Sequence, residues 1–112
     1  MFNKMVTPTG GGGFNGLTFV TQNNNSFTVS GLTVGKRYIC ITNQCFTSGS
    51  GGTTLSSGAT ENMTPSVCYN YWGSYYFTTT VHDITATSTT VVFAPKSNTP
   101  NGNYYTVVYE VA

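Results

Sequence analysis

Few side chains in this sequence could do acid–base, nucleophilic or metal chemistry. The 112 residues include a single histidine, His82, which stands next to Asp83. Neighbouring side chains on a strand point to opposite faces, so these two cannot readily form a general base with its orienting carboxylate. A Gly-x-Ser-x-Gly elbow and a phosphate-binding loop that leads into a helix are both missing from the sequence. We therefore predict that the protein is not an enzyme, and we expect His82 to be exposed on a strand.

Three cysteines are the remaining candidates for metal binding: Cys40, Cys45 and Cys68. The spacing of Cys40 and Cys45 is compatible with half of a zinc site, but Cys68 and His82 are too far apart to supply the other half. Buried thiols that pack as small apolar groups are far more common. We predict no metal and no cofactor. A Cys40–Cys45 disulfide, formed in an oxidising compartment, is the open alternative.

The candidate binding site is the aromatic stretch Tyr69-Asn70-Tyr71-Trp72-Gly73-Ser74-Tyr75-Tyr76. Aromatic rings beside Asn and Ser can stack on sugar faces, and Tyr and Trp also dominate protein interfaces. Alternation along strands should turn part of these rings inward. We predict that Tyr69, Tyr71 and Tyr76 point outward and that Asn70 and Trp72 contribute near the turn. A purely structural role for these rings is the open alternative.

A second pattern, Leu32-Thr33-Val34-Gly35-Lys36-Arg37-Tyr38, leads into a strand. It resembles the tyrosine corner of fibronectin type III and related Greek-key domains, although Val34 stands where that family usually has Pro. The resemblance implies that the Tyr38 hydroxyl bonds to backbone a few residues upstream and holds a crossover between sheets. We expect this structural role for Leu32, Gly35 and Tyr38. We infer no other property of that family for this chain, because the tyrosine corner of the family lies late in the domain, whereas the pattern in this sequence lies early.

Charged residues form 6% of the chain, against about 25% in an average protein. Four Lys and Arg residues spread along the sequence make a poor footprint for nucleic acid, so we predict no such partner. No segment reaches the ~20 apolar residues that span a bilayer, so we predict no membrane association. A net charge near zero only weakly opposes contact between copies, which favours a homo-oligomer or assembly with neighbouring proteins.

Period-two alternation of apolar and polar residues predicts the elements that must position these side chains. The expected strands are 17–21, 27–29, 36–42, 67–72, 75–82 and 104–111, a hairpin of 83–87 with 89–94, and a weak strand around 53–55 within a long loop, 48–58. No window has helical periodicity. The prediction is an all-β fold over residues 17–112, an antiparallel β-sandwich or jelly roll of about eight or nine short strands. Residues 1–16 contain four consecutive glycines and are predicted to be a flexible arm.

The same alternation assigns side chains to faces. In the last two long strands we place the more apolar rows inside: Tyr75, Phe77, Thr79 and Val81, and Tyr105, Val107, Tyr109 and Val111. The complementary rows, which include His82 and Thr106, then face outward. Replacing Val107 by Asp should unfold the domain, because it would bury an unpaired charge, whereas the same change at Thr106 should be mild.

The sequence as a whole combines a Gly-rich N-terminal segment, short predicted strands rich in Thr, Asn and Ser, few charged residues and an aromatic C-terminal strand. It resembles the small β-sandwich modules of bacteriophage tail, fibre or head-decoration proteins. The resemblance implies a virion structural or adhesion protein, made in the host cytoplasm and released on lysis, that contacts a host glycan, a host surface protein or neighbouring virion proteins. The absence of an apolar secretory signal near Met1 is in line with this expectation. The alternative is a carbohydrate-binding module of a bacterial surface or secreted protein, which would be extracellular.

Overall fold

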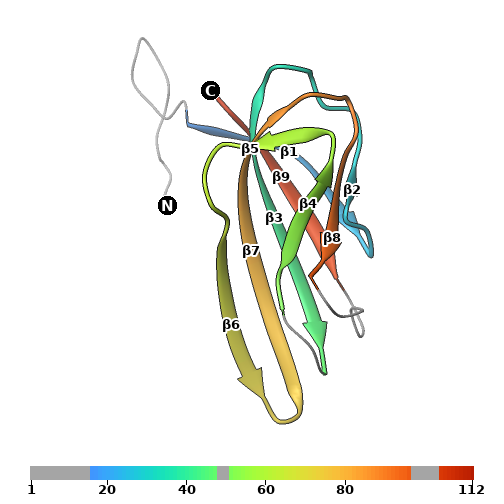
Figure 1. Cartoon of the computed structure of the whole chain (residues 1–112), viewed down its shortest axis with the longest axis vertical. Helices are drawn as coiled ribbons and strands as arrows, with labels where there is room; N and C mark the ends of the chain where they lie inside the picture. The colour runs from blue at the N-terminus through green and yellow to red at the C-terminus, as the bar shows by residue number, and fades with distance from the viewer. Residues whose placement is uncertain (1–15, 48–50, 97–103) are drawn as a thin grey trace.

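The computed structural model describes residues 16–47, 51–96 and 104–112, which form nine strands in two antiparallel sheets (Figure 1). The strands are β1 (Leu17–Asn24), β2 (Thr28–Val29), β3 (Arg37–Phe46), β4 (Thr53–Ser57), β5 (Ala59–Glu61), β6 (Ser66–Trp72), β7 (Tyr75–Ala86), β8 (Val91–Pro95) and β9 (Tyr105–Val111). Six strands form one sheet and three form the other, consistent with a β-sandwich. The predicted all-β class and number of strands are therefore confirmed.

The larger sheet is built around β7. Its strand order is β1-β9-β3-β7-β5, and β6 pairs with β7 along the same side as β5. The smaller sheet has the order β2-β8-β4. We call the face of the six-stranded sheet that lies toward the smaller sheet its inner face, and the opposite one its outer face.

The predicted hairpin of 83–87 with 89–94 is wrong, because β7 and β8 belong to different sheets. The segment between these strands carries the chain from one sheet to the other. Backbone bonds hold it to Gly58, whose carbonyl accepts from the N–H groups of Thr87 at 2.8 Å and Ser88 at 3.0 Å. The residues that look like a hairpin turn thus pack against the connection between β4 and β5, and β8 pairs with β2 and β4.

The space between the sheets has an apolar part and a hydroxyl-rich part. The apolar part consists of Phe27, Val29, Leu32, Tyr38, Cys40, Ile84, Ala86, Val91, Phe93 and Val108. The hydroxyl-rich part contains five buried threonines, Thr42, Thr53, Thr78, Thr80 and Thr106. Threonine has the β-branched shape that packs well in sheets. Its hydroxyl can be buried at low cost where it is hydrogen-bonded, as between Thr106 Oγ1 and the Ser26 carbonyl at 2.9 Å.

Two of the predicted inward rows face outward instead. In β9, Thr106 and Val108 are fully buried, whereas Val107 is half-buried on the outer face. In β7, His82 is buried and Phe77 is 41% exposed. The apolar content of a row did not indicate which row is buried, because threonine side chains with hydrogen-bonded hydroxyls occupy the interior. The prediction of Val107 inside and Thr106 outside is therefore wrong.

The segment before β3 has the contacts of a tyrosine corner. Tyr38 is buried, and its hydroxyl oxygen accepts a hydrogen bond from the Thr33 backbone N–H at 2.9 Å. Leu32 is buried beside it in the apolar core, and Gly35 has a φ of 89°. That left-handed conformation suits glycine, which has no side chain to clash. These contacts brace the entry of the chain into the larger sheet.

The predicted N-terminal arm falls almost wholly outside the described residues. Gly16, the last residue of that predicted arm, accepts a bond through its carbonyl from the Ala112 N–H at 3.0 Å. The two ends of the described chain therefore lie together beside β1 and β9. None of the described segments forms a helix that could span a membrane.

Candidate functional site

The aromatic stretch predicted as a binding site folds into the β6–β7 hairpin. A two-residue turn, Gly73 and Ser74, joins the strands, and the φ of 61° at Gly73 is in the left-handed region that favours glycine. Figure 1 shows this hairpin reaching beyond the ends of the three-stranded sheet. The smaller sheet therefore does not cover the hairpin tip, and rings that share a face with the core come into contact with solvent.

The register of the hairpin divides the five predicted residues between two faces. Tyr69 pairs with Thr78 and Tyr71 with Tyr76, so that these tyrosines belong to the inner face. Asn70 and Trp72 occupy the outer face. Sequence reasoning placed all five near one another, but they form two separate surfaces. The physical reason is strand alternation, which turns consecutive side chains of β6 to opposite sides.

On the inner face, three rings form a ladder at the open end of the sandwich. Tyr71 and Tyr76 meet edge to face with centroids 4.7 Å apart, and Tyr76 meets Phe46 of β3 at 5.3 Å. Phe46 is buried, whereas Tyr71 is 64% exposed. Tyr69 adds a hydroxyl that donates to the Gly51 carbonyl at 3.4 Å. The ladder thus anchors exposed rings on the core and holds them in fixed orientations.

On the outer face, Trp72 is 75% exposed, more than any other large apolar side chain in the described part of the chain. Tyr75 lies directly opposite it in the hairpin, and both Tyr75 and Phe77 are exposed rather than buried as the sequence predicted. These two residues extend the aromatic surface beyond the predicted set. Alternation along β7 would have predicted that Tyr75 and Phe77 are exposed, if it had been known which of the two rows of side chains is buried.

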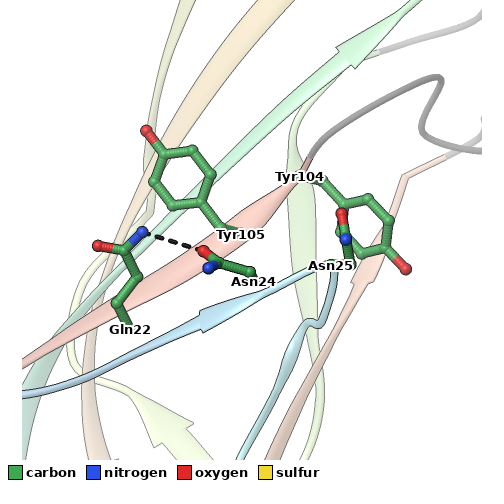
Figure 2. Close-up of a pocket in the computed structure, with 5 residues that line it drawn as sticks. All are labelled: Gln22, Asn24, Asn25, Tyr104 and Tyr105. Carbon is green, nitrogen blue, oxygen red and sulfur yellow. Dashed lines mark hydrogen bonds between the residues drawn. The ribbon is translucent and has the colours of Figure 1, made fainter.

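A hollow that the sequence did not predict lies where β1 ends beside the start of β9 (Figure 2). Its lining consists of Gln22, Asn24, Asn25, Tyr104 and Tyr105. Figure 2 shows the two tyrosine rings apart from each other, with Asn24 between them, Asn25 beside Tyr104 and Gln22 beside Tyr105. The Gln22 Nε2 group donates to Asn24 Oδ1 at 3.0 Å. Amides beside aromatic rings can bond hydroxyls and stack on an apolar face, which is the chemistry that a sugar requires.

The single histidine is fully buried, so the prediction of an exposed His82 is wrong. Its Nε2 atom lies 2.8 Å from Thr53 Oγ1, and its Nδ1 atom lies 3.0 Å from Glu61 Oε2. Glu61 reaches the ring because β5 pairs with β7 and places Glu61 opposite Ile84, on the same face as His82. Asp83 points to the other face, as predicted. The carboxylate partner comes from a strand that the sequence did not reveal.

The order hydroxyl, imidazole, carboxylate is that of a nucleophile with its base and orienting acid. Thr53 is only 3% exposed, however, and its Oγ1 atom is also bonded to Thr42 Oγ1 at 2.7 Å. A substrate from solvent cannot reach a hydroxyl in this position. The chain of bonds satisfies polar groups inside the sandwich and connects β3, β4, β5 and β7.

Protonation of His82 should weaken the fold in mild acid. Burial lowers the pKa of His82 from its ordinary value of 6.5, while the Glu61 carboxylate acts in the opposite direction. Below pH 6.5 the unfolded chain therefore binds a proton that the folded protein resists. The free energy of unfolding should fall as pH drops below this value, by up to about 1.4 kcal/mol per pH unit.

Urea unfolding monitored by circular dichroism between neutral pH and pH 5 measures this slope. The variant Glu61→Gln should show a steeper slope, because it removes the group that raises the His82 pKa. The variant His82→Gln should show almost none, since no other side chain has an ordinary pKa in that range. A slope that persists in His82→Gln would contradict the assignment.

The cysteines do not come together. Cys40 is buried on the inner face, and burial raises the pKa of its thiol to about 12. Cys45 is five positions further along β3 and therefore on the outer face, so the disulfide and the shared zinc site considered from the sequence are both excluded. All three cysteines are free thiols. No group of three metal-ligating side chains occurs within the described ranges.

The charges in the described part of the chain are largely neutralised by one another. Arg37 binds Asp83 through two bonds of 2.8 and 2.6 Å, and this contact holds the pKa of the Asp83 carboxyl below its usual range. Lys36 Nζ lies 2.7 Å from Glu110 Oε2. The surface therefore offers little charge with which to recognise an ionic ligand.

Fold and site together define a small all-β sandwich with an exposed aromatic hairpin and an amide-lined hollow. Comparison of the chain with protein-family models, with curated proteins and with solved structures found no match.

Proposed function

We propose that this protein is a non-enzymatic structural or adhesion module of a virion, of the kind found in phage tails, fibres or head decorations. It acts by contact with a protein or a glycan. The observation that supports this proposal most is the projecting hairpin, which presents Tyr71 and Trp72 at 64% and 75% exposure. A large exposed ring is costly in water unless a partner covers it, and Tyr and Trp supply much of the binding energy at interfaces.

The low charge of the surface supports the same proposal. With its ion pairs formed inside the chain, the protein would bind through hydroxyl, amide and aromatic groups. Contacts of this kind are individually weak, and many of them act together at an interface. A virion presents many copies of such a module, so that weak contacts add up to strong attachment.

The alternative function is a carbohydrate-binding module of a bacterial surface or secreted protein. The hollow at the end of β1 and the start of β9 favours it, because Gln22, Asn24 and Tyr105 offer amide and aromatic groups in one place. The two functions predict different binding surfaces: the hairpin tip for adhesion and the hollow for the module. Substitutions can therefore separate them.

The proposed test measures binding to a panel of immobilised bacterial surface polysaccharides and envelope proteins. If the hairpin is the contact surface, Tyr71→Ala and Trp72→Ala should each weaken binding by at least about tenfold. Val34→Ala is the matched control, because it removes an exposed apolar side chain from another part of the surface. Binding that survives both hairpin substitutions would contradict the proposal, and its loss in Tyr105→Ala instead would favour the module.

A further inference from the structure

The outer face of the six-stranded sheet is apolar at its centre. The register aligns side chains of four neighbouring strands into two rungs across this face, Phe19-Tyr109-Ile39-Asp83 and Gln22-Val107-Ile41-Val81. The exposed ring of Phe77 lies two rungs further along β7, opposite Cys45. Phe19 is 58% exposed and Val81 is 36% exposed. An antiparallel sheet with one face in water normally carries polar residues on that face.

We propose that a second copy of this chain covers the outer face, so that two sandwiches associate through their larger sheets. In β9 the outward row of valines and tyrosines is more apolar than the inward row, which includes Thr106. Such a pattern is typical of a sheet that is buried on both sides. The smaller sheet covers the inner face except at the hairpin tip, and the second copy covers the outer face.

The charges on this face suit a copy of itself better than a charged partner. Arg37 and Asp83 lie at one end and neutralise each other through their paired bonds. In a two-fold symmetric contact, each residue meets the same kind of surface on the other subunit, so that an unpaired charge would meet a like charge near the axis. A face without net charge avoids this repulsion.

The polar groups on the face are also compatible with burial. Asn43 and Thr79 lie opposite each other beside the apolar rungs, and Thr79 Oγ1 donates to Asn43 Oδ1 at 2.6 Å. Because this pair is already bonded within the sheet, a partner can cover it at low cost.

The size of the face matches the requirement of a stable pair. Strands β1, β9, β3, β7 and β6 lie side by side in this sheet. At about 4.8 Å per strand and about eight residues of ~3.4 Å each, they cover roughly 650 Å² in projection. Side chains add to this area, and a typical stable interface buries about 800 Å² per partner. Sheets that pack face to face lie about 10 Å apart with interlocking side chains.

Light scattering after size exclusion, over a range of concentrations, tests the proposal on the full chain. The wild-type protein should have twice the chain mass of 12.0 kDa. Val81→Lys and Phe77→Asp should each raise the dissociation constant by at least about a hundredfold and give monomers. Both residues are exposed in the single chain, so the variants should remain folded, as circular dichroism can verify. Thr54→Lys, on the exposed side of the smaller sheet, should leave the dimer intact.

A monomeric wild-type protein would overturn the proposal, whether residues of the same chain or another protein cover the face. A dimer that persists in both Val81→Lys and Phe77→Asp would overturn it as well, and so would a larger assembly, because this pairing closes at two copies. The adhesion test also uses Trp72, which lies on the outer face near Phe77, but Tyr71 lies on the inner face and Tyr71→Ala should leave the dimer intact. The two proposals can therefore fail independently.

Discussion

Replacing Val108 by Asp should unfold the protein. Val108 is fully inaccessible and belongs to the apolar core that also includes Ile84 and Val91. Its neighbours on β3 and β1 are Cys40 and Thr21, neither of which can neutralise a carboxylate. An unpaired buried charge costs about 3–5 kcal/mol, compared with a total stability of about 5–15 kcal/mol for a domain. Circular dichroism and urea unfolding measure the loss.

Val107→Asp is the matched control, one position away in the same strand. Val107 is half-buried on the outer face, where a carboxylate can reach water in the single chain. The monomer should therefore remain folded, with a loss of stability far below that of Val108→Asp. This order is the reverse of the one that the sequence predicted. Equal losses at the two positions would show that the assignment of faces in β9 is wrong.

Replacing Gly58 by Ala should cost roughly 3–5 kcal/mol, because two separate effects act at this position. The φ of Gly58 is 91°, in a region that residues with a side chain rarely adopt. An added Cβ would also collide with the backbone carbonyl oxygen of Thr90 and crowd Val91. Both neighbours are backbone atoms at the crossing from β7 to β8, so they cannot move aside without displacing β8. Thermal and urea unfolding should both show the loss.

Gly31→Ala separates the two effects. Gly31 has a φ of 79°, but an added Cβ would meet no atom within 4 Å. Only the backbone strain should remain, at about 1–2 kcal/mol. Loss of stability in Gly31→Ala as large as in Gly58→Ala would mean that the crowding at Thr90 is relieved in solution.

Part of the fold could be predicted because it depends on local patterns. Tyr38 and Cys40 on one face of β3, with Ile39 and Ile41 on the other, follow from alternation, and the structure confirms them. A turn at Gly73 and Ser74 follows from the break between the expected strands 67–72 and 75–82, and the structure has it there. Strand β6 and the aromatic character of the hairpin follow from the same local signals. Such features need only the preferences of a few neighbouring residues.

The candidate sites were harder to predict, because they depend on strands that are distant in the sequence. Glu61 reaches His82 only through the pairing of β5 with β7, and the hollow forms where Gln22 and Tyr105 meet across β1 and β9. Neither the pairing of β5 with β7 nor that of β1 with β9 can be predicted from the types of residues in these strands. The alternation around Thr53 is weak, so the sequence did not predict that β4 places the Thr53 hydroxyl beside His82.

Alternation in the sequence determined that β7 and β9 each have two rows of side chains, and which residues share a row. It could not determine which row is inside, since both rows contain residues that sheets accept: threonine and valine in one, valine and tyrosine in the other. The position of the smaller sheet decided this, by covering Thr80, Thr106 and Val108 and leaving Val81 and Val107 on the far side. The physical reason is that a buried threonine costs little once its hydroxyl is bonded, and those partners exist only after the two sheets have come together.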